Sequence, residues 1–132
     1  MKGSYALLMC LKNHKEIDVG SLGSISFPKG YYLYIGSAMN GIEGRVKRHK
    51  RDRKKLHWHV DYLLNKARIS SIYFLESRQR LECSLAKRFA DRFEVISKFG
   101  SSDCHCESHL FFGDHDELRE CALYNGMNEF FL

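Results

Sequence analysis

Proline is nearly missing from this chain, which has one proline among 132 residues. Glycine is also not abundant, with ten residues, and low contents of both proline and glycine argue against a disordered chain. No apolar run approaches the roughly 20 residues that a membrane-spanning helix needs. The first residues, Met1 to Tyr5, also lack the apolar stretch of a secretory signal. We therefore expect a cytoplasmic protein with no membrane partner, folded as a single domain over residues 1–132.

A disulfide framework is also not expected. The chain has five cysteines, an odd number, and three of them (Cys10, Cys83 and Cys121) stand inside apolar stretches. This pattern fits buried free thiols in a reducing compartment.

Acids are scarce in one segment, Arg45–Lys55, which we call the basic segment. It holds eight of the 21 Lys and Arg residues and one acid, Asp52. The whole chain has a net charge of +5, so the residues outside the segment carry a net negative charge. Such a segment attracts a polyanion, most often a nucleic-acid backbone, although a solvated helix face gives the same pattern. The candidate nucleic-acid contacts are Lys47, Arg48, Lys50, Arg51, Arg53, Lys54 and Lys55.

Hydrophobic patterning predicts an alternation of strands and helices. Strands are expected at 5–11, 31–35 and 69–75, with a short edge strand between 16 and 27. Helices are expected from Ile42, over 56–67, over 81–93, and from Asp114 to Asn125. This order of elements predicts a small α/β or α+β fold in which helices flank a sheet.

Arg45 and His49 are four residues apart, so on a helix they share one face. A guanidinium can stabilise the charge that builds on a phosphate under attack, and an imidazole can transfer a proton near neutral pH. Both residues also belong to the basic segment, so the pair alone is a weak signal.

Glu82 heads the apolar stripe of the third expected helix. A buried carboxylate needs a partner, either a divalent metal or an arginine. The alternative is an exposed acid in the first helical turn that interacts with the helix dipole. Tyr5 and Tyr34 lie on two expected strands, where most tyrosines pack with the hydroxyl in water.

Cys104, Cys106 and His109 form a second cluster of candidate ligands. Two thiols and an imidazole suit zinc, and the fourth ligand would come from His57, His59 or His115. However, the Cys-x-Cys spacing is tighter than in most structural zinc sites, and there is no second cysteine pair. The sequence therefore argues more against zinc than for it.

Taken together, these residues resemble the GIY-YIG nuclease superfamily. The first signature triplet is Gly3-Ser4-Tyr5 and the second is Tyr34-Ile35-Gly36, and Arg45, His49 and Glu82 follow. The tracts His57–Leu64 and Ser102–Leu110 are similar to the Uri-type branch, which is catalogued as domain of unknown function 123. Ser4 stands where isoleucine is usual, and Ser37 where several catalytic relatives have a lysine.

The resemblance implies a three-stranded antiparallel sheet, here with an added edge strand, and a phosphodiester hydrolase with one Mg²⁺ or Mn²⁺ ion. Tyr5 or Tyr34 would orient or deprotonate the attacking water, and Arg45 would stabilise the pentavalent phosphate. His49 would assist proton transfer, and Glu82 would hold the metal.

We therefore expect a metal-dependent endonuclease that acts on nucleic acid, and on DNA rather than RNA. One alternative is a non-catalytic nucleic-acid-binding module on the same fold. Another is a zinc-stabilised interaction protein built on Cys104, Cys106 and His109. The sequence leaves the oligomeric state open.

Overall fold

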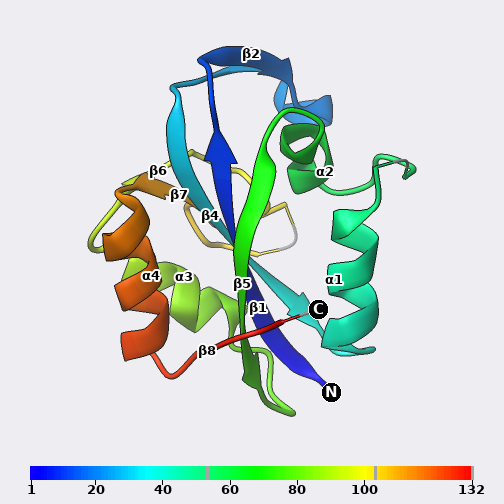
Figure 1. Ribbon diagram of the computed structural model, residues 1–132, viewed down its shortest axis with the longest axis vertical. Coiled ribbons are helices and arrows are strands. Elements are labelled where there is room, and N and C mark those ends of the chain that lie inside the picture. Colours follow the sequence, from blue (N-terminus) through cyan, green and yellow to red (C-terminus); the bar gives the residue numbers. More distant parts are fainter. Residues whose placement is uncertain (53, 103, 132) are drawn as a thin grey trace.

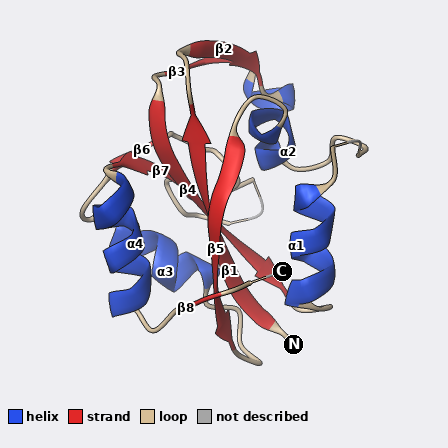
Figure 2. Cartoon of the chain, viewed as in Figure 1, coloured by secondary structure: helices blue, strands red, loops and turns tan. Residues whose placement is uncertain are grey.

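The computed structural model describes residues 1–52, 54–102 and 104–131, so the predicted nucleic-acid contact Arg53 lies outside the described residues. Over these ranges the chain forms a six-stranded antiparallel sheet with four α-helices (Figures 1 and 2). The strands are β1 (Gly3–Leu11), β4 (Gly30–Ala38), β5 (Arg68–Glu76), β6 (Glu94–Val95), β7 (Leu110–Gly113) and β8 (Asn128–Glu129). The helices are α1 (Ile42–Lys50), α2 (His59–Leu64), α3 (Glu82–Ala90) and α4 (His115–Tyr124).

The three predicted strands form the centre of the sheet, whose order is β6-β7-β4-β1-β5-β8. Strand β1 is buried along almost its whole length because it pairs with β4 on one side and β5 on the other. In the register of β1 with β4, Tyr5 lies opposite Gly36 and Leu7 opposite Tyr34. The two signature triplets are therefore neighbours in the sheet.

The prediction that residues 16–27 add an edge strand to the main sheet was wrong. Residues 15–27 form a separate hairpin of β2 (Lys15–Asp18) and β3 (Ser24–Phe27), joined by a short 3₁₀ turn, Gly20–Leu22. The hairpin is largely exposed and buries only one residue on each strand, so it can cover one end of the molecule without joining the main sheet (Figure 1). The main sheet is instead widened by β7 and β6 beyond β4 and by β8 beyond β5.

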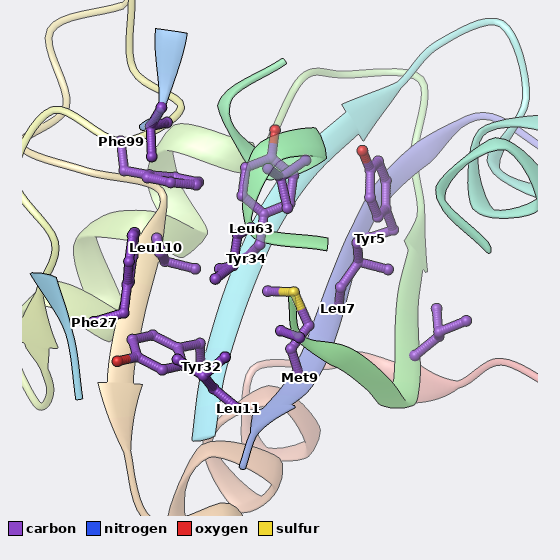
Figure 3. Close-up of a cluster of buried hydrophobic side chains, with 14 of the residues drawn as sticks. Tyr5, Leu7, Met9, Leu11, Phe27, Tyr32, Tyr34, Leu63, Phe99 and Leu110 are labelled. Atoms are coloured by element: carbon purple, nitrogen blue, oxygen red, sulfur yellow. The ribbon is translucent and has the colours of Figure 1, made fainter. Parts of the chain in front are cut away.

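Helices cover both faces of the sheet. Because successive strand residues point to opposite faces, each central strand contributes side chains to two cores. Tyr5, Leu7 and Tyr34 face a core that includes residues of α1 and α2, part of which is drawn in Figure 3. Ala6 and Ile35 face a second core with residues of α3 and α4. Within the described residues, no helix is long and apolar enough to cross a membrane.

The helix ends follow local hydrogen bonds. Helix α4 begins after Asp114, whose carboxylate accepts from the backbone N–H groups of Asp116 and Glu117, as the sequence predicts. Helix α2 is shorter than predicted because the Asp61 carboxylate accepts from the backbone N–H groups of His57 and Trp58. Those hydrogen bonds hold the chain before His59 in an extended entry to the helix.

Gly36 allows the close approach of β1 and β4. A Cβ atom at this position would lie 2.5 Å from both Cζ and the hydroxyl oxygen of Tyr5, and real Cβ atoms do not come so close. The Tyr5 ring is itself fully buried, so it has little room to move away. The glycine of the second triplet is therefore required by the tyrosine of the first.

We expect Gly36→Ala to lower the free energy of unfolding by about 2 kcal/mol or more, the usual cost of overpacking a core. Gly44→Ala is the matched control, because a Cβ there meets no atom within 4 Å and lies inside α1. It should raise stability by about 0.5–1 kcal/mol through helix propensity. Urea denaturation measures both changes, and an unchanged midpoint for Gly36→Ala would contradict the packing of Tyr5 on Gly36.

Candidate functional site

Tyr5 and His49 form the centre of the candidate site. The Tyr5 hydroxyl lies 2.7 Å from Nε2 of His49, and both side chains are buried. Burial lowers the pKa of His49 to about 3, although the carboxylate of Asp61 opposes this shift. His49 is therefore neutral at pH 7, and its Nε2 can accept the hydrogen bond from Tyr5.

Asp61 lies behind His49. One of its carboxylate oxygens is 4.0 Å from Nδ1 of His49 and accepts a 2.9 Å hydrogen bond from Arg48. The other oxygen accepts from Arg48 at 3.0 Å. Burial alone would raise the pKa of this carboxyl, but the hydrogen bonds from Arg48 and two backbone N–H groups hold the pKa of Asp61 below its usual range. A buried anion thus faces the far side of the imidazole.

Arg45 lies at the outer side of this cluster. Its guanidinium donates a 2.9 Å hydrogen bond to the Ser37 carbonyl oxygen of β4. The guanidinium groups of Arg45 and Arg48 both contact the Trp58 ring, and each guanidinium carbon lies 4.3 Å from the ring centroid. Arg45 is half-buried. It therefore reaches both the buried tyrosine–histidine pair and the surface.

Tyr34 packs beside Tyr5, with the two ring centroids 6.3 Å apart. In Figure 3 the hydroxyl oxygens of the two tyrosines lie at the same end of the cluster. Burial raises the pKa of Tyr5 to about 12, partly opposed by Arg45, and raises the pKa of Tyr34 well above its ordinary value. Both phenols are therefore protonated at neutral pH, and they can orient or relay a proton but do not rest as phenolates.

Helix α3 begins at Glu82, one residue later than predicted, and Leu85, Ala86 and Phe89 form the predicted buried stripe behind this acid. Its Oε2 atom is buried and has no hydrogen-bond partner within the described part of the chain. The hydroxyl oxygens of Ser4 and Ser37 are also buried and have no hydrogen-bond partner within the described part of the chain. These serines pair across β1 and β4 and, by strand alternation, point to the face that α3 covers.

A hard divalent cation binds carboxylate, hydroxyl and water oxygens, so the unpartnered oxygen of Glu82 is a candidate ligand for one. The two serines were not predicted as site residues. Side chains alternate between the two faces along each strand, so Ser4 and Ser37 were predictable as residues that face away from Tyr5 and Tyr34.

The structure brings Tyr5, Tyr34, Arg45 and His49 together, but Glu82 approaches from the other side of the sheet. No hydrogen bond between Glu82 and these four residues occurs among the described residues. The negative charge of Glu82 does contribute to the raised pKa of Tyr34, which indicates proximity. Strand β7 and His109 bond to β4 only as far as Ile35, so residues 36–38 have no neighbouring strand on that side within the described part of the chain.

The basic segment has two kinds of residue. Arg48 and Lys54 make internal contacts, since Arg48 binds Asp61 and the Lys55 carbonyl, and the Lys54 ammonium donates to the carbonyls of His49 and Arg51. The side chains that remain exposed to solvent are those of Lys47, Lys50, Arg51 and Lys55. Among the described residues of the segment, this second set is available to an external polyanion without loss of internal hydrogen bonds.

A separate cluster joins Cys104, Cys106 and His109 to Cys83, the second residue of α3. The four ligand atoms all lie within 4.8 Å of one another, so the cluster could bind a metal ion. Thiolate and imidazole ligands favour zinc over Mg²⁺ or Mn²⁺. All five cysteines are free thiols.

The fourth member of this cluster was predicted wrongly. His57, His59 and His115 are not part of it, and His59 Nδ1 instead accepts a 2.8 Å hydrogen bond from the backbone N–H of Gly100. Cys83 was interpreted as a buried free thiol, but it is only half-buried and faces the other three ligands. No short-range spacing signals it, because α3 and the later loop meet only in the folded chain.

Comparison with known families gives one match. The family model described as domain of unknown function DUF123 matches residues 4–130. Searches among curated proteins and among solved structures find no match. The matched range includes every residue of the two clusters described above.

The buried His49 makes stability depend on pH. Its pKa is about 3 in the folded chain and about 6.5 in the unfolded chain, so its contribution is complete above pH 6.5 and is lost as the pH falls towards 3. Protonation of His49 in the unfolded chain should therefore lower the free energy of unfolding by up to about 1.4 kcal/mol for each unit that the pH falls below 6.5.

Urea denaturation at pH 7, 6 and 5 measures the slope. His49→Gln should make it shallower by about that amount, whereas His14→Gln, at an exposed position, should leave it unchanged. Burial also lowers the pKa of His59 and His109, so part of the slope should remain in the variant. An unaltered slope in His49→Gln would show that the imidazole is not buried in its neutral form.

Proposed function

This chain belongs to the DUF123 family, and we propose that it is a divalent-metal-dependent endonuclease of the GIY-YIG type that hydrolyses phosphodiester bonds in DNA. The observation that carries the proposal is the 2.7 Å contact between the Tyr5 hydroxyl and His49 Nε2, beside the Arg45 guanidinium. A buried phenol–imidazole pair next to a cation suits proton transfer at a phosphate. The two triplets and the residues after them support the superfamily.

In the proposed reaction, Tyr5 and His49 act as a proton relay. Water attacks phosphorus, and its proton passes to the Tyr5 oxygen while the Tyr5 proton passes to His49 Nε2. The imidazolium that results is stabilised by the Asp61 carboxylate 4.0 Å from Nδ1. The new P–O bond forms as the bond to the leaving oxygen breaks, the leaving oxygen takes up a proton from solvent water, and His49 later returns its extra proton to solvent.

Arg45 and Tyr34 have positioning and charge roles. The Arg45 guanidinium, half-buried and stacked near Trp58, binds the non-bridging oxygens, on which negative charge increases in the transition state. Tyr34 keeps 7% of its surface exposed, against 1% for Tyr5, so its hydroxyl would orient the attacking water while Tyr5 takes up the proton.

Glu82 is the proposed ligand of Mg²⁺ or Mn²⁺. Its buried and unpartnered Oε2 supports this assignment, and the hydroxyls of Ser4 and Ser37 are two further unpartnered oxygens on the same face of the sheet. When bound, such an ion supplies positive charge that favours phosphate binding and departure of the leaving oxygen. The carboxylate itself gains a counter-charge that it otherwise lacks.

Cleavage is tested with supercoiled plasmid and branched DNA in Mg²⁺ and in Mn²⁺. The wild-type chain should nick DNA, and Glu82→Gln, Arg45→Ala and Tyr5→Phe should each lose roughly 100-fold or more in rate. Glu120→Gln, an exposed acid on α4, is the control and should keep full activity. If clean wild-type protein binds DNA but cleaves no substrate, the non-catalytic binding module replaces the endonuclease.

DNA binding should depend on the exposed cations of the basic segment. The double variant Lys50→Glu, Arg51→Glu should bind DNA about tenfold or more weakly at moderate salt, and its affinity should change less with salt concentration. Its Tm should stay near wild type, because neither side chain has an internal contact among the described residues.

Lys12→Glu, Lys15→Glu makes the same charge change at exposed positions near the β2–β3 hairpin. It should weaken binding much less. Equal losses in the two double variants, measured by fluorescence anisotropy, would mean that the net charge and not the basic segment determines affinity.

A further inference from the structure

We propose that Cys83, Cys104, Cys106 and His109 bind one zinc ion, which cross-links the start of α3 to the loop between Phe99 and Leu110. This site is distinct from the proposed hydrolytic site. It does not depend on whether the chain cleaves nucleic acid.

The distances fit a tetrahedral ion. For zinc bonds of about 2.3 Å to sulfur and 2.0–2.1 Å to nitrogen, tetrahedral geometry puts sulfur and nitrogen about 3.6 Å apart. His109 Nε2 lies 3.5 Å from Cys104 Sγ and 3.9 Å from Cys83 Sγ. The whole donor set lies within 4.8 Å, so the chain is already folded around a point that all four ligands can reach.

The orientation of His109 supports a metal ligand more directly. Its Nδ1 lies 3.1 Å from the carbonyl oxygen of Ile35, so this nitrogen carries the proton and donates. Nε2 then has a free lone pair aimed at the thiols, 3.5 Å from Cys104 Sγ and 3.9 Å from Cys83 Sγ. A carbonyl that fixes the second ring nitrogen is the common outer contact of zinc-bound histidines.

Backbone contacts hold His109 in place. Its N–H donates to the Phe99 carbonyl at 2.8 Å, and its own carbonyl accepts from the Ile35 N–H at 3.0 Å. His109 is therefore fixed to β4 at the middle residue of the second triplet. Cys104 and Cys106 lie in the loop that precedes it.

Cys83 gives the site its structural role. It directly follows Glu82 at the start of α3, so a bond from its sulfur to the ion would tie the first turn of the helix to the loop and to β4. With four protein ligands the site is closed, as structural zinc sites are, and leaves no position for a substrate. Zinc binding would thus hold the Glu82 backbone in position without taking part in the reaction.

Metal analysis of the wild-type chain tests this without a variant. Protein purified with no added metal should carry about one equivalent of zinc by mass spectrometry, and a mercurial reagent that modifies the thiols should release it. Chelation should lower Tm by about 10 °C or more, since metal binding contributes to folding. Under a tenth of an equivalent, with no uptake of added zinc, overturns the proposal.

Variants separate the cluster from other thiols. Cys83→Ser and Cys104→Ser should each reduce bound zinc at least fivefold, whereas Cys10→Ser, a half-buried cysteine outside the cluster, should retain one equivalent. Glu82→Gln should also retain one equivalent, because the carboxylate is not a ligand of this site. Loss of zinc in Cys10→Ser, or its retention in Cys83→Ser, would contradict the assignment.

Cobalt gives a readout of geometry. Co²⁺ bound by three thiolates and one imidazole in a tetrahedron should show strong sulfur charge-transfer and visible absorption bands, and zinc should displace it. Weak bands of an octahedral ion would overturn the assignment. If the protein as purified carries no zinc and shows fewer than five titratable thiols after denaturation, two of the thiols form a disulfide, and that result would also overturn the assignment. None of these measurements uses nucleic acid, so the proposal can stand or fail apart from the endonuclease.

Discussion

The antiparallel register of β1 with β4 is the constraint on which the candidate site depends. It sets Tyr5 against Gly36 and puts the hydroxyls of both tyrosines at one end of the sheet. Because side chains alternate along a strand, a slip of β1 by one residue would turn Tyr5 to the face covered by α3 while Tyr34 stayed in place. Tyr5 would then not meet α1, and His49 would lose the partner of its Nε2.

Buried polar groups show how the two faces differ. On the α1 face a chain of polar contacts runs from Tyr5 through His49 towards Asp61 and Arg48, and the hydrogen bonds from Arg48 stabilise a buried carboxylate that would otherwise be costly. In this set the Nδ1 atom of His49, 4.0 Å from Asp61, has no hydrogen-bond partner within the described residues. On the α3 face the oxygens of Ser4, Ser37 and Glu82 also lack partners within the described residues. The first set is therefore mostly paired within the chain, and the second is suited to a group that the chain does not supply.

Much of this arrangement follows from local sequence. The apolar and aromatic runs identify the three central strands, and the four-residue spacing of Arg45 and His49 correctly places both on one face of α1. Asp114 marks the start of α4 because its capping contacts lie within three residues. Each of these features depends on neighbours in the sequence, which is why patterning alone detects them.

The features that were missed depend on contacts between distant residues. The link of Arg48 to Asp61 and the approach of Cys83 to Cys104 join different elements, and nothing in either local pattern specifies the partner. The hairpin at residues 15–27 has strand-like spacing, but spacing does not say which sheet a strand joins. The position of Glu82 was predicted on its helix, yet the side of the sheet from which it approaches was not.

The central position of β1 has a consequence for synthesis of the protein. Of the three central strands β1 is made first, and its two neighbours end at Ala38 and Glu76, so a nascent chain carries this apolar strand without both of its partners until Glu76 has been added. Long-range strand pairing of this kind is slow, and unpaired apolar strands associate readily. Incomplete chains are therefore expected to associate through this segment until β5 has emerged.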